Sequence, residues 1–536
     1  MKLLLPIKKI WLPLLLHLVF MVFLFQVGFT TQEWKDAKAA THLSFPSDPE
    51  VLASMPGHLV KYIRYFYISN SDELLYRNMA TLALNGDFDK EFWTKSKLRD
   101  VPLQLPERPW PYKDVMIEYP PLAFLVLLPP ALIATSYNGY IFWFGVWITL
   151  IYLVNLWLIL YLFSEKPLQK ERFQERLKKL LWWSFGFVLL LGNIVVHRFD
   201  AAIPTFMLLA ALAFERGLRH ENRGSQWWVA LSGVISAAGV LFKIVPGLVS
   251  VALVAAIWFS NRKDRLRLSV FHFSALLLTI AGLHFVFWNL FGDNYWRTYF
   301  YHVDRGIQLE STYSGLLLAL GPMLGVEVTR TIGFGSDNVS SNLVPVLGKL
   351  SQPLFLIALG TMFYLLWKAS STRKQFKPSQ TTDVIGKSAI LMVCLTWVFI
   401  LTNKVFSPQY LIWVAPLMLG MVVVKPEFFR FGVLFLVISL MTQGIFPRLY
   451  YLMREFNPFM VALLNARNLL SILLVGLLFK QLLRMYGAKK KAPVFQPKVV
   501  EAEPEQPEFE PFRPLASPVC PIMEAKGAQT GEHQIV

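Results

Sequence analysis

The sequence predicts an all-α polytopic membrane protein with about twelve membrane-spanning helices and two large extracytoplasmic loops. Three observations point to this class. Of the 536 residues, 55% are hydrophobic and only 16% are charged. The apolar residues come in repeated runs close to the ~20 residues that cross a bilayer as a helix. Basic residues gather in the short loops between these runs, as the positive-inside rule expects.

The net charge of +17 does not indicate a nucleic-acid-binding protein. Its basic residues lie in loops between apolar runs, and neither a zinc-ligand spacing nor an RNP-like aromatic pattern accompanies them. The two cysteines are Cys394, in an apolar run, and Cys520, near the C-terminus, so no disulfide framework is visible.

The first apolar run follows Lys2, Lys8 and Lys9, and no small-residue cleavage site comes after it. We therefore expect an uncleaved first span rather than a signal peptide. The predicted spans lie near residues 10–29, 140–163, 181–197, 201–215, 226–242, 244–259, 269–291, 350–367, 388–402, 408–424, 431–446 and 460–479.

Loop charge predicts the orientation of these spans. If the N-terminus is inside, every strongly basic short loop falls on the inner side, which favours twelve crossings with both termini inside. The basic residues of these loops are Lys166, Lys170, Arg172, Arg176, Lys178, Lys179, Arg216, Arg219, Arg223, Arg262, Lys263, Arg265, Arg267, Lys368, Arg373, Lys374, Lys377, Lys425, Arg430, Lys480, Arg484 and Lys489–Lys491.

One apolar stretch, "EYPPLAFLVLLPPALIATSYN" at 118–138, does not fit this count as a full crossing. Its paired prolines also disfavour a simple span. We interpret it as a re-entrant or interfacial segment at the outer face, the alternative being an ordinary thirteenth span. The large outer loops then cover about 30–118 and 292–349, within a membrane domain of residues 1–486. The Pro- and Glu-rich remainder, 487–536, is predicted to be a disordered cytoplasmic tail.

Three predicted outer turns carry charges beside apolar runs: "HRFDAAIP" with Arg198 and Asp200, "LFKIVPG" with Lys243, and "NKVFSPQY" with Lys404. A charge buried in a bilayer costs roughly 2.5–3.5 kcal/mol on insertion scales. Three such turns on one face indicate a shared polar cavity that suits a phosphate headgroup. The alternative is that each long side chain reaches water by itself.

The outer loops add carboxylates and aromatic rings. Asp72 and Glu73 open the helical pattern "DELLYRNMATLALNG", and Glu118 precedes "YPPL". Asp72 could also be only a helix N-cap. The second loop contains "NYWRTYFYHVDRGIQLEST", whose rings could stack on a sugar or form an interfacial aromatic belt. These rings are Tyr295, Trp296, Tyr299, Tyr301 and His302.

Four stretches in this order resemble the polyprenyl-phosphate-mannose-dependent mannosyltransferases of the GT-C superfamily, and bacterial members of the DUF2029 type look closest. They are "DELLYRNMATLALNG" with "EYPPLAFLVLLPP", "NIVVHRFDAAIPTFMLLAALAFERG", "AAGVLFKIVPGLV" and "NKVFSPQYLIWVAPL". The last two stretches are also similar to the first mannosyltransferase of glycosylphosphatidylinositol assembly.

The resemblance implies a GT-C-like fold and a hexosyl transfer with inversion, with mannose as the expected sugar. The donor would be a polyprenyl-phosphate sugar embedded among the membrane lipids, and the acceptor would be a glycolipid or glycan. The site would lie on the extracytoplasmic face of a bacterial plasma membrane. The family's acidic base corresponds here to Asp72, with Glu73 as the neighbouring candidate.

An inverting glycosyl transfer requires the same kinds of groups, a carboxylate and cations. A carboxylate must take the acceptor's proton, and cations must stabilise the departing phosphate. A divalent metal is compatible with this transfer, and "GDFD" (86–89) is a weak variant of a metal-binding DxD pattern, but no strong set of ligands stands out. The predicted substrate-binding residues are Tyr76, Glu118, Tyr119, Arg198, Asp200, Lys243, Lys404, Ser407, Gln409 and Tyr410.

The same residues are compatible with two other functions. A transporter or flippase for a lipid-linked or anionic substrate would also place charges along a pathway, although no internal repeat accompanies them. A membrane scaffold without chemistry would use the same charges only for folding.

Overall fold

The computed structural model describes seven stretches of the chain. Most of the predicted first outer loop, the end of the first predicted span, and the predicted tail lie outside them, including Cys520, Asp87 and Asp89. The described residues are 10–21, 71–86, 106–163, 170–219, 224–260, 263–371 and 381–487, all within the first of two units, Met1–Ala488 and Lys489–Val536.

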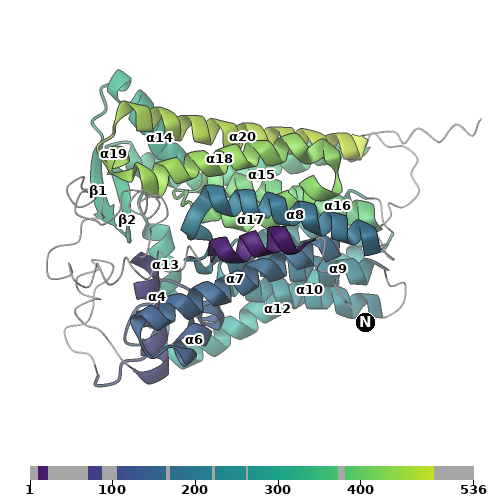
Figure 1. The fold of residues 1–536 in the computed structure, drawn as a ribbon, viewed down its shortest axis with the longest axis horizontal. Coiled ribbons are helices and arrows are strands. Elements are labelled where there is room, and N and C mark those ends of the chain that lie inside the picture. The colour runs from purple at the N-terminus through teal and green to yellow at the C-terminus, as the bar shows by residue number, and fades with distance from the viewer. Residues whose placement is uncertain are drawn as a thin grey trace, which may run out of the picture. The chain divides into compact units, whose positions relative to one another are not determined.

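The described residues form a mainly helical polytopic membrane protein, in which nine helical segments are long and apolar enough to cross a membrane. All nine coincide with predicted spans (Figure 1). Their main helices are α7 (Tyr137–Leu162), α8 (Lys170–Leu191), α9 (Ala202–Arg219), α10 (Gly224–Phe242), α12 (Arg265–Phe291), α15 (Val344–Ser371), α16 (Thr381–Thr402), α18 (Phe429–Gln443) and α20 (Pro458–Gly487).

The other three predicted spans contain shorter apolar helices: Trp11–Met21, α11 (Gly247–Trp258) and α17 (Tyr410–Val424). At 1.5 Å per residue, α17 is roughly 22 Å long, less than the ~30 Å hydrocarbon core of a bilayer. Almost all of α17 is buried by protein. A helix enclosed in this way need not reach both surfaces, and its first turn, with Tyr410 and Trp413, lines a cavity.

The stretch predicted to be re-entrant or interfacial forms the turn η2 (Pro121–Ala123) and the short helix α6 (Phe124–Ile133). Pro129 and Pro130 lie inside α6, which ends before Ala134. This helical segment spans only roughly 20 Å, so it is too short for a straight crossing. It packs against α7 and against α4 (Ser71–Asn85).

The second outer loop adds a β-hairpin, which the all-α prediction did not contain. Strands β1 and β2 pair antiparallel, with Thr331 opposite Asn338. The turn residues Phe334 and Gly335 both have positive φ, as the tight turns of two-residue hairpins require.

The remaining elements are α13 (Arg297–Asp304), α14 (Thr312–Leu320), β1 (Thr329–Gly333), β2 (Ser336–Ser340) and α19 (Tyr450–Arg454), with the short turns η3 (Gly192–Val195), η4 (Phe199–Ala201), η5 (Asp293–Trp296), η6 (Pro322–Leu324), η7 (Pro426–Phe428) and η8 (Gly444–Arg448).

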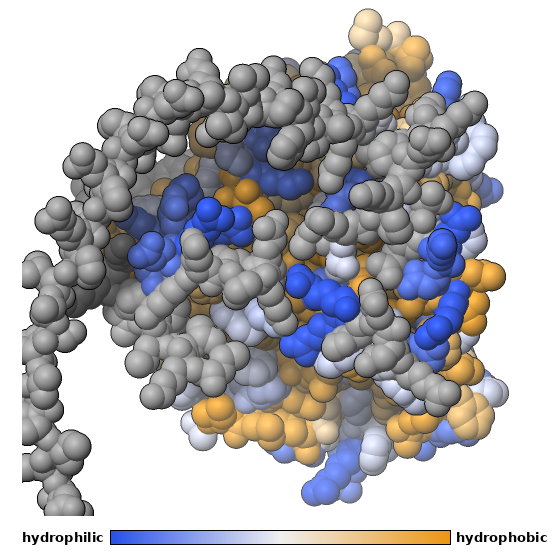
Figure 2. Space-filling model, turned by 90° about the vertical axis from the view of Figure 1, so that its right-hand side faces the viewer, coloured by the Kyte–Doolittle hydropathy of each residue, from blue (hydrophilic) through white to orange (hydrophobic). Residues whose placement is uncertain are grey.

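The helix bundle has two chemically different ends. The hairpin, α13 and α19 lie at one end, on the left of Figure 1. Helices α9, α15 and α20 begin near that end and carry basic residues in their last turns, as predicted for the inner loops. Patches of hydrophilic residues lie among apolar ones on the opposite face, at the right of Figure 1 (Figure 2). We call these the cavity end and the basic end.

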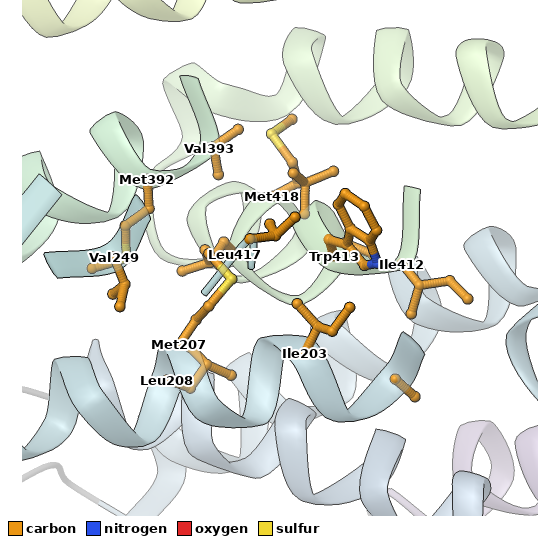
Figure 3. Close-up of a cluster of buried hydrophobic side chains, with 14 of the residues drawn as sticks. Ile203, Met207, Leu208, Val249, Met392, Val393, Ile412, Trp413, Leu417 and Met418 are labelled. Carbon is orange, nitrogen blue, oxygen red and sulfur yellow. The ribbon is translucent and has the colours of Figure 1, made fainter. Parts of the chain in front are cut away.

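The middle of the bundle is a packed apolar core. Ile203 and Met207 of α9 meet Met392 of α16 and Leu417 of α17 there, and all four are fully buried or nearly so (Figure 3). Small residues allow the close helix contacts typical of membrane proteins. A Cβ on Gly233 of α10, for example, would lie 2.2 Å from a backbone oxygen of α12.

Candidate functional site

A cavity of about 1560 Å³ opens among the elements of the cavity end. Segments far apart in the sequence form its walls, including the start of α4, the three charged turns and the second outer loop. Nine of the twelve predicted site residues line it: Asp72, Glu118, Tyr119, Arg198, Lys243, Lys404, Ser407, Gln409 and Tyr410. The shared cavity expected from the sequence is therefore present.

An ion pair joins the first loop to the first charged turn. Asp72 lies in the first turn of α4, where the helix dipole favours a negative charge. Its Oδ2 pairs with Nη1 of Arg198, in the turn before α9. Burial lowers the pKa of Arg198 to about 10, against the opposing effect of Asp200, so the guanidinium remains charged at neutral pH. The cavity wall thus holds a fixed carboxylate beside a fixed cation.

Two predicted residues of α4 lie behind this wall instead of in it. Glu73 is fully buried and its carboxylate contacts Nδ1 of His197. Tyr76 is buried with its ring 5.3 Å from that of Phe199 and 6.0 Å from that of Tyr119. These two residues dock α4 onto the turn that carries Arg198.

Lys243 and Trp413 form the base of the cavity, and Asp200 lies behind them. Asp200 is buried and accepts hydrogen bonds from Lys243 Nζ at 2.8 Å and from Trp413 Nε1 at 2.7 Å. The Lys243 ammonium also lies 5.1 Å from the centre of the Phe199 ring and 5.2 Å from that of Trp413. Tyr410 stacks on Trp413 with 3.9 Å between ring centres. Asp200 therefore orients Lys243 from outside the cavity, whereas Lys243 reaches into it.

The third charged turn contributes Lys404, Ser407 and Gln409. The Lys404 ammonium donates to the carbonyl of Val303 at 2.7 Å. Among the described residues it forms no ion pair. Partial burial lowers the pKa of Lys404, and nearby Asp304 opposes this effect. Ser407 Oγ donates to Gln409 Oε1 at 2.6 Å.

Glu118 is buried at the cavity wall, where the second outer loop meets the first. His302 Nε2 donates to the Glu118 backbone oxygen at 3.0 Å. Of the aromatic residues considered from the sequence, Trp296, Tyr299, Tyr301 and His302 line the cavity. Tyr295 is instead buried in the adjoining core.

The second outer loop and α19 form a part of the cavity that was not predicted from the sequence. Asp337 accepts from Arg330 at 3.2 Å and from Arg454 at 3.0 Å. Burial raises the pKa of the Glu310 carboxyl to about 7, although its own backbone amide and Arg467 oppose the rise. The polar set missed here comprises Arg305, Gln308, Glu310, Asp337, Tyr450 and Arg454.

A signal for part of this region was present in the sequence. Arg467 interrupts the apolar run of the last predicted span, as Lys404 interrupts its own run. It is buried, lies 3.6 Å from the centre of the Phe406 ring, and donates to the Glu310 backbone oxygen at 2.5 Å. Nothing local in the sequence marks Glu310 itself as buried.

The described residues do not offer a metal-binding cluster of three or more His, Cys, Asp or Glu side chains. The "GDFD" carboxylates lie outside the described ranges. No family model, curated protein or solved structure matches the chain.

Proposed function

We propose that this protein is a GT-C-type glycosyltransferase of a bacterial plasma membrane. It transfers a hexose, mannose in our proposal, from a polyprenyl-phosphate donor to a glycolipid or glycan acceptor on the extracytoplasmic face, with inversion. The proposal depends on one observation. A single cavity at one end of the membrane helix bundle is lined by the Asp72 carboxylate and by the cations Arg198, Lys243 and Lys404.

Asp72 is the proposed general base. The acceptor oxygen attacks the anomeric carbon, its proton passes to the Asp72 carboxylate, and the bond from the anomeric carbon to the phosphate oxygen breaks. Asp72 lines the cavity, whereas Glu73 lies behind the wall against His197. This difference favours Asp72 over Glu73 as the base. Glu118 is the other carboxylate from the predicted set in this cavity.

The cations suit the leaving group. The departing polyprenyl phosphate gains negative charge as the sugar leaves, and fixed positive groups stabilise that charge. Arg198 pairs with Asp72 on the cavity wall, and Lys243 pairs with Asp200 behind it. Lys404 donates to a backbone carbonyl and forms no ion pair among the described residues, although Asp304 lies near it, so it is the cation with the most charge left to share with a phosphate.

The cavity also borders a lipid-facing helix. Phe355 and Gln352 of α15 line it. Their neighbours Leu354, Leu356 and Ile357 are exposed apolar residues on a helix that is mostly unburied by protein. A polyprenyl chain could therefore lie along α15 while its phosphate enters the polar cavity.

The packing below the cavity favours an enzyme over the transporter or flippase that the sequence left open. Trp413 lines the cavity, and deeper in the bundle Met207, Leu417 and Met418 are fully buried (Figure 3). A transport pathway through the membrane would have to open this apolar layer. A transferase needs access from only one end.

The test is transfer from radiolabelled polyprenyl-phosphate mannose in membranes that contain the intact protein, its Asp72→Asn variant or the control variant Asp383→Asn. Asp383 pairs with Lys387 in the first turn of α16, away from the cavity. We expect a loss of at least about 100-fold for Asp72→Asn and none for the control. Equal transfer by all three proteins would remove Asp72 as the base. Lipid-linked substrate crossing sealed vesicles without product would favour the flippase.

A further inference from the structure

The cavity has a second polar region, away from the Asp72–Arg198 pair, where residues 305–310, the β-hairpin and α19 meet. It contains Gln308 and Glu310, both of which line the cavity. Gln308 is 5% exposed and Glu310 is 2% exposed. Neither residue has a role in the transfer step proposed above.

Both side chains present an unused hydrogen-bond acceptor. Gln308 Oε1 and Glu310 Oε2 are buried and have no partner among the described residues. Most other buried side-chain atoms without a partner among the described residues lie away from the cavity, whereas Gln308 Oε1, Glu310 Oε2 and Arg305 Nε belong to residues that line it. The atoms that would satisfy the two acceptors are donors from a molecule in the cavity.

The backbone around these residues is held firmly. The Gln308 amide donates to the Lys404 carbonyl at 2.9 Å, and Arg467 donates to the Glu310 carbonyl at 2.5 Å. Directly after Glu310, Ser311 caps α14 by accepting from the Ser314 amide at 3.1 Å. The backbone that carries the two unused acceptors is therefore fixed in place.

The charged groups near Gln308 and Glu310 disfavour some classes of ligand. Arg305 and Arg454 line the same region, and Arg467 lies behind Glu310. These three guanidinium groups outnumber the two carboxyl groups of the region, Glu310 and Asp337, which pairs with Arg454, and this disfavours a cationic ligand such as an ammonium. A fully ionised phosphate has no hydrogen to donate to Gln308 Oε1 or Glu310 Oε2. A neutral ligand rich in hydroxyl groups meets both conditions.

Aromatic rings complete this wall. Tyr450 and Phe446 line the cavity with their ring centres 4.9 Å apart, and Phe334 of the hairpin turn lines it as well. The C–H face of a sugar ring packs against such rings while its hydroxyls point to acceptors at the side.

We propose that Gln308 and Glu310 form a sugar-hydroxyl subsite of the transferase cavity, with Tyr450 and Phe446 as its apolar wall. This inference rests on the proposed function, because the identification of the substrate as a sugar comes from it. The hydroxyls belong either to the hexose of the donor or to the acceptor sugar, and the experiment separates these two sources.

The first measurement is the affinity of methyl α-mannopyranoside for the full-length protein in nanodiscs, by saturation-transfer NMR. The variants are Glu310→Gln and Gln308→Ala. The matched controls are Glu215→Gln, at a buried carboxylate paired with Arg219, and Gln174→Ala, at a buried amide in α8; neither control residue lines the cavity. We expect at least a tenfold loss of affinity for each test variant and no loss for the controls. Unchanged binding by both folded test variants, or no glycoside binding by the wild type, would overturn the subsite.

The second measurement compares polyprenyl-phosphate mannose with sugar-free polyprenyl phosphate. If the subsite holds the donor hexose, Glu310→Gln weakens binding of the first lipid and not of the second. If it holds the acceptor, both lipids bind as before while glycoside affinity falls. Either result supports the subsite and assigns its sugar.

These binding readouts do not depend on turnover. If glycoside binding needs Glu310 but Asp72→Asn transfers normally, the subsite stands and the proposed base is wrong. If Asp72→Asn abolishes transfer but the Glu310 and Gln308 variants bind glycosides as the wild type does, the proposed function stands and the subsite is wrong.

Discussion

Lys243 Nζ lies 2.8 Å from Asp200 Oδ1, so two of the charged turns that frame the cavity are joined by one buried ion pair. Asp200 is almost fully buried and Lys243 is 20% exposed. The pair places a cation at the base of the cavity, and it makes the stability of this region depend on both partners.

We predict that Lys243→Met destabilises the protein more than the double variant Asp200→Asn/Lys243→Met. Removing one partner of a buried pair leaves an uncompensated charge and costs about 3–5 kcal/mol, whereas removing both charges avoids most of that cost. Thermal unfolding in detergent measures the order of stability. Both variants should lose transfer, since both lack the cation. A double variant less stable than the single one would contradict this account.

Glu73→Gln should separate the two adjacent carboxylates of α4. Glu73 is fully buried against His197 and does not line the cavity. We therefore expect a lower unfolding temperature with transfer per folded molecule within about threefold of wild type, whereas Asp72→Asn loses at least about 100-fold. Transfer corrected for the folded fraction is the measurement. A loss for Glu73→Gln as large as that for Asp72→Asn would make Glu73 part of the chemistry.

Glu310 should make sugar binding depend on pH near neutrality. Burial raises the pKa of Glu310 to about 7, so its carboxylate, the stronger acceptor for hydroxyls, is lost as the pH falls through that value. The titratable and charged groups that face it are Arg305, Asp337 of β2, Tyr410 of α17, Tyr450 of α19 and Arg467 of α20.

We expect the glycoside affinity of the wild type to fall between pH 8 and pH 6, and that of Glu310→Gln to stay constant over this window. Titrations by saturation-transfer NMR at four or five pH values measure both curves. An equal slope in the two proteins would assign the dependence to another group.

The same shift predicts an effect on stability. Because the folded-state pKa of Glu310 is raised, its contribution is most favourable below the ordinary carboxyl value of 4.5 and is lost as the pH rises through about 7. Glu310→Gln should therefore gain unfolding temperature relative to wild type at pH 8, by an amount worth at most about 3 kcal/mol, and gain less at pH 5. A larger gain at pH 5 would have the wrong sign.

Helix packing gives a prediction outside the site. A Cβ on Gly233 would lie 2.2 Å from the His272 carbonyl oxygen, whereas one on Gly282 of α12 meets nothing within 4 Å. We expect Gly233→Ala to lower the free energy of unfolding by at least about 1–3 kcal/mol through overpacking, and Gly282→Ala to leave it unchanged or raise it. Thermal unfolding of the two variants in the same detergent tests the contrast.

Local sequence was sufficient for most of the architecture. Apolar runs placed a helix at each of the twelve predicted spans, at least over the residues described. Charges inside such runs led to Arg198, Lys243 and Lys404, because a costly charge must have a polar environment within reach. The β-hairpin was missed because its short strands, "TRTIG" and "SDNVS", alternate only weakly between apolar and polar residues.

The sequence by itself determined the helical membrane class, the order of the helices and the charged turns, because each of these depends on composition over a short window. Only the tertiary structure decided which side chains reach the cavity. Asp72 and Glu73 are neighbours in sequence, but consecutive side chains on a helix point about 100° apart, so the docking of α4 turns one toward the cavity and the other toward His197. The burial of Glu310 also depends on tertiary contacts. Arg467, which donates to the Glu310 backbone oxygen, lies 157 residues away along the chain.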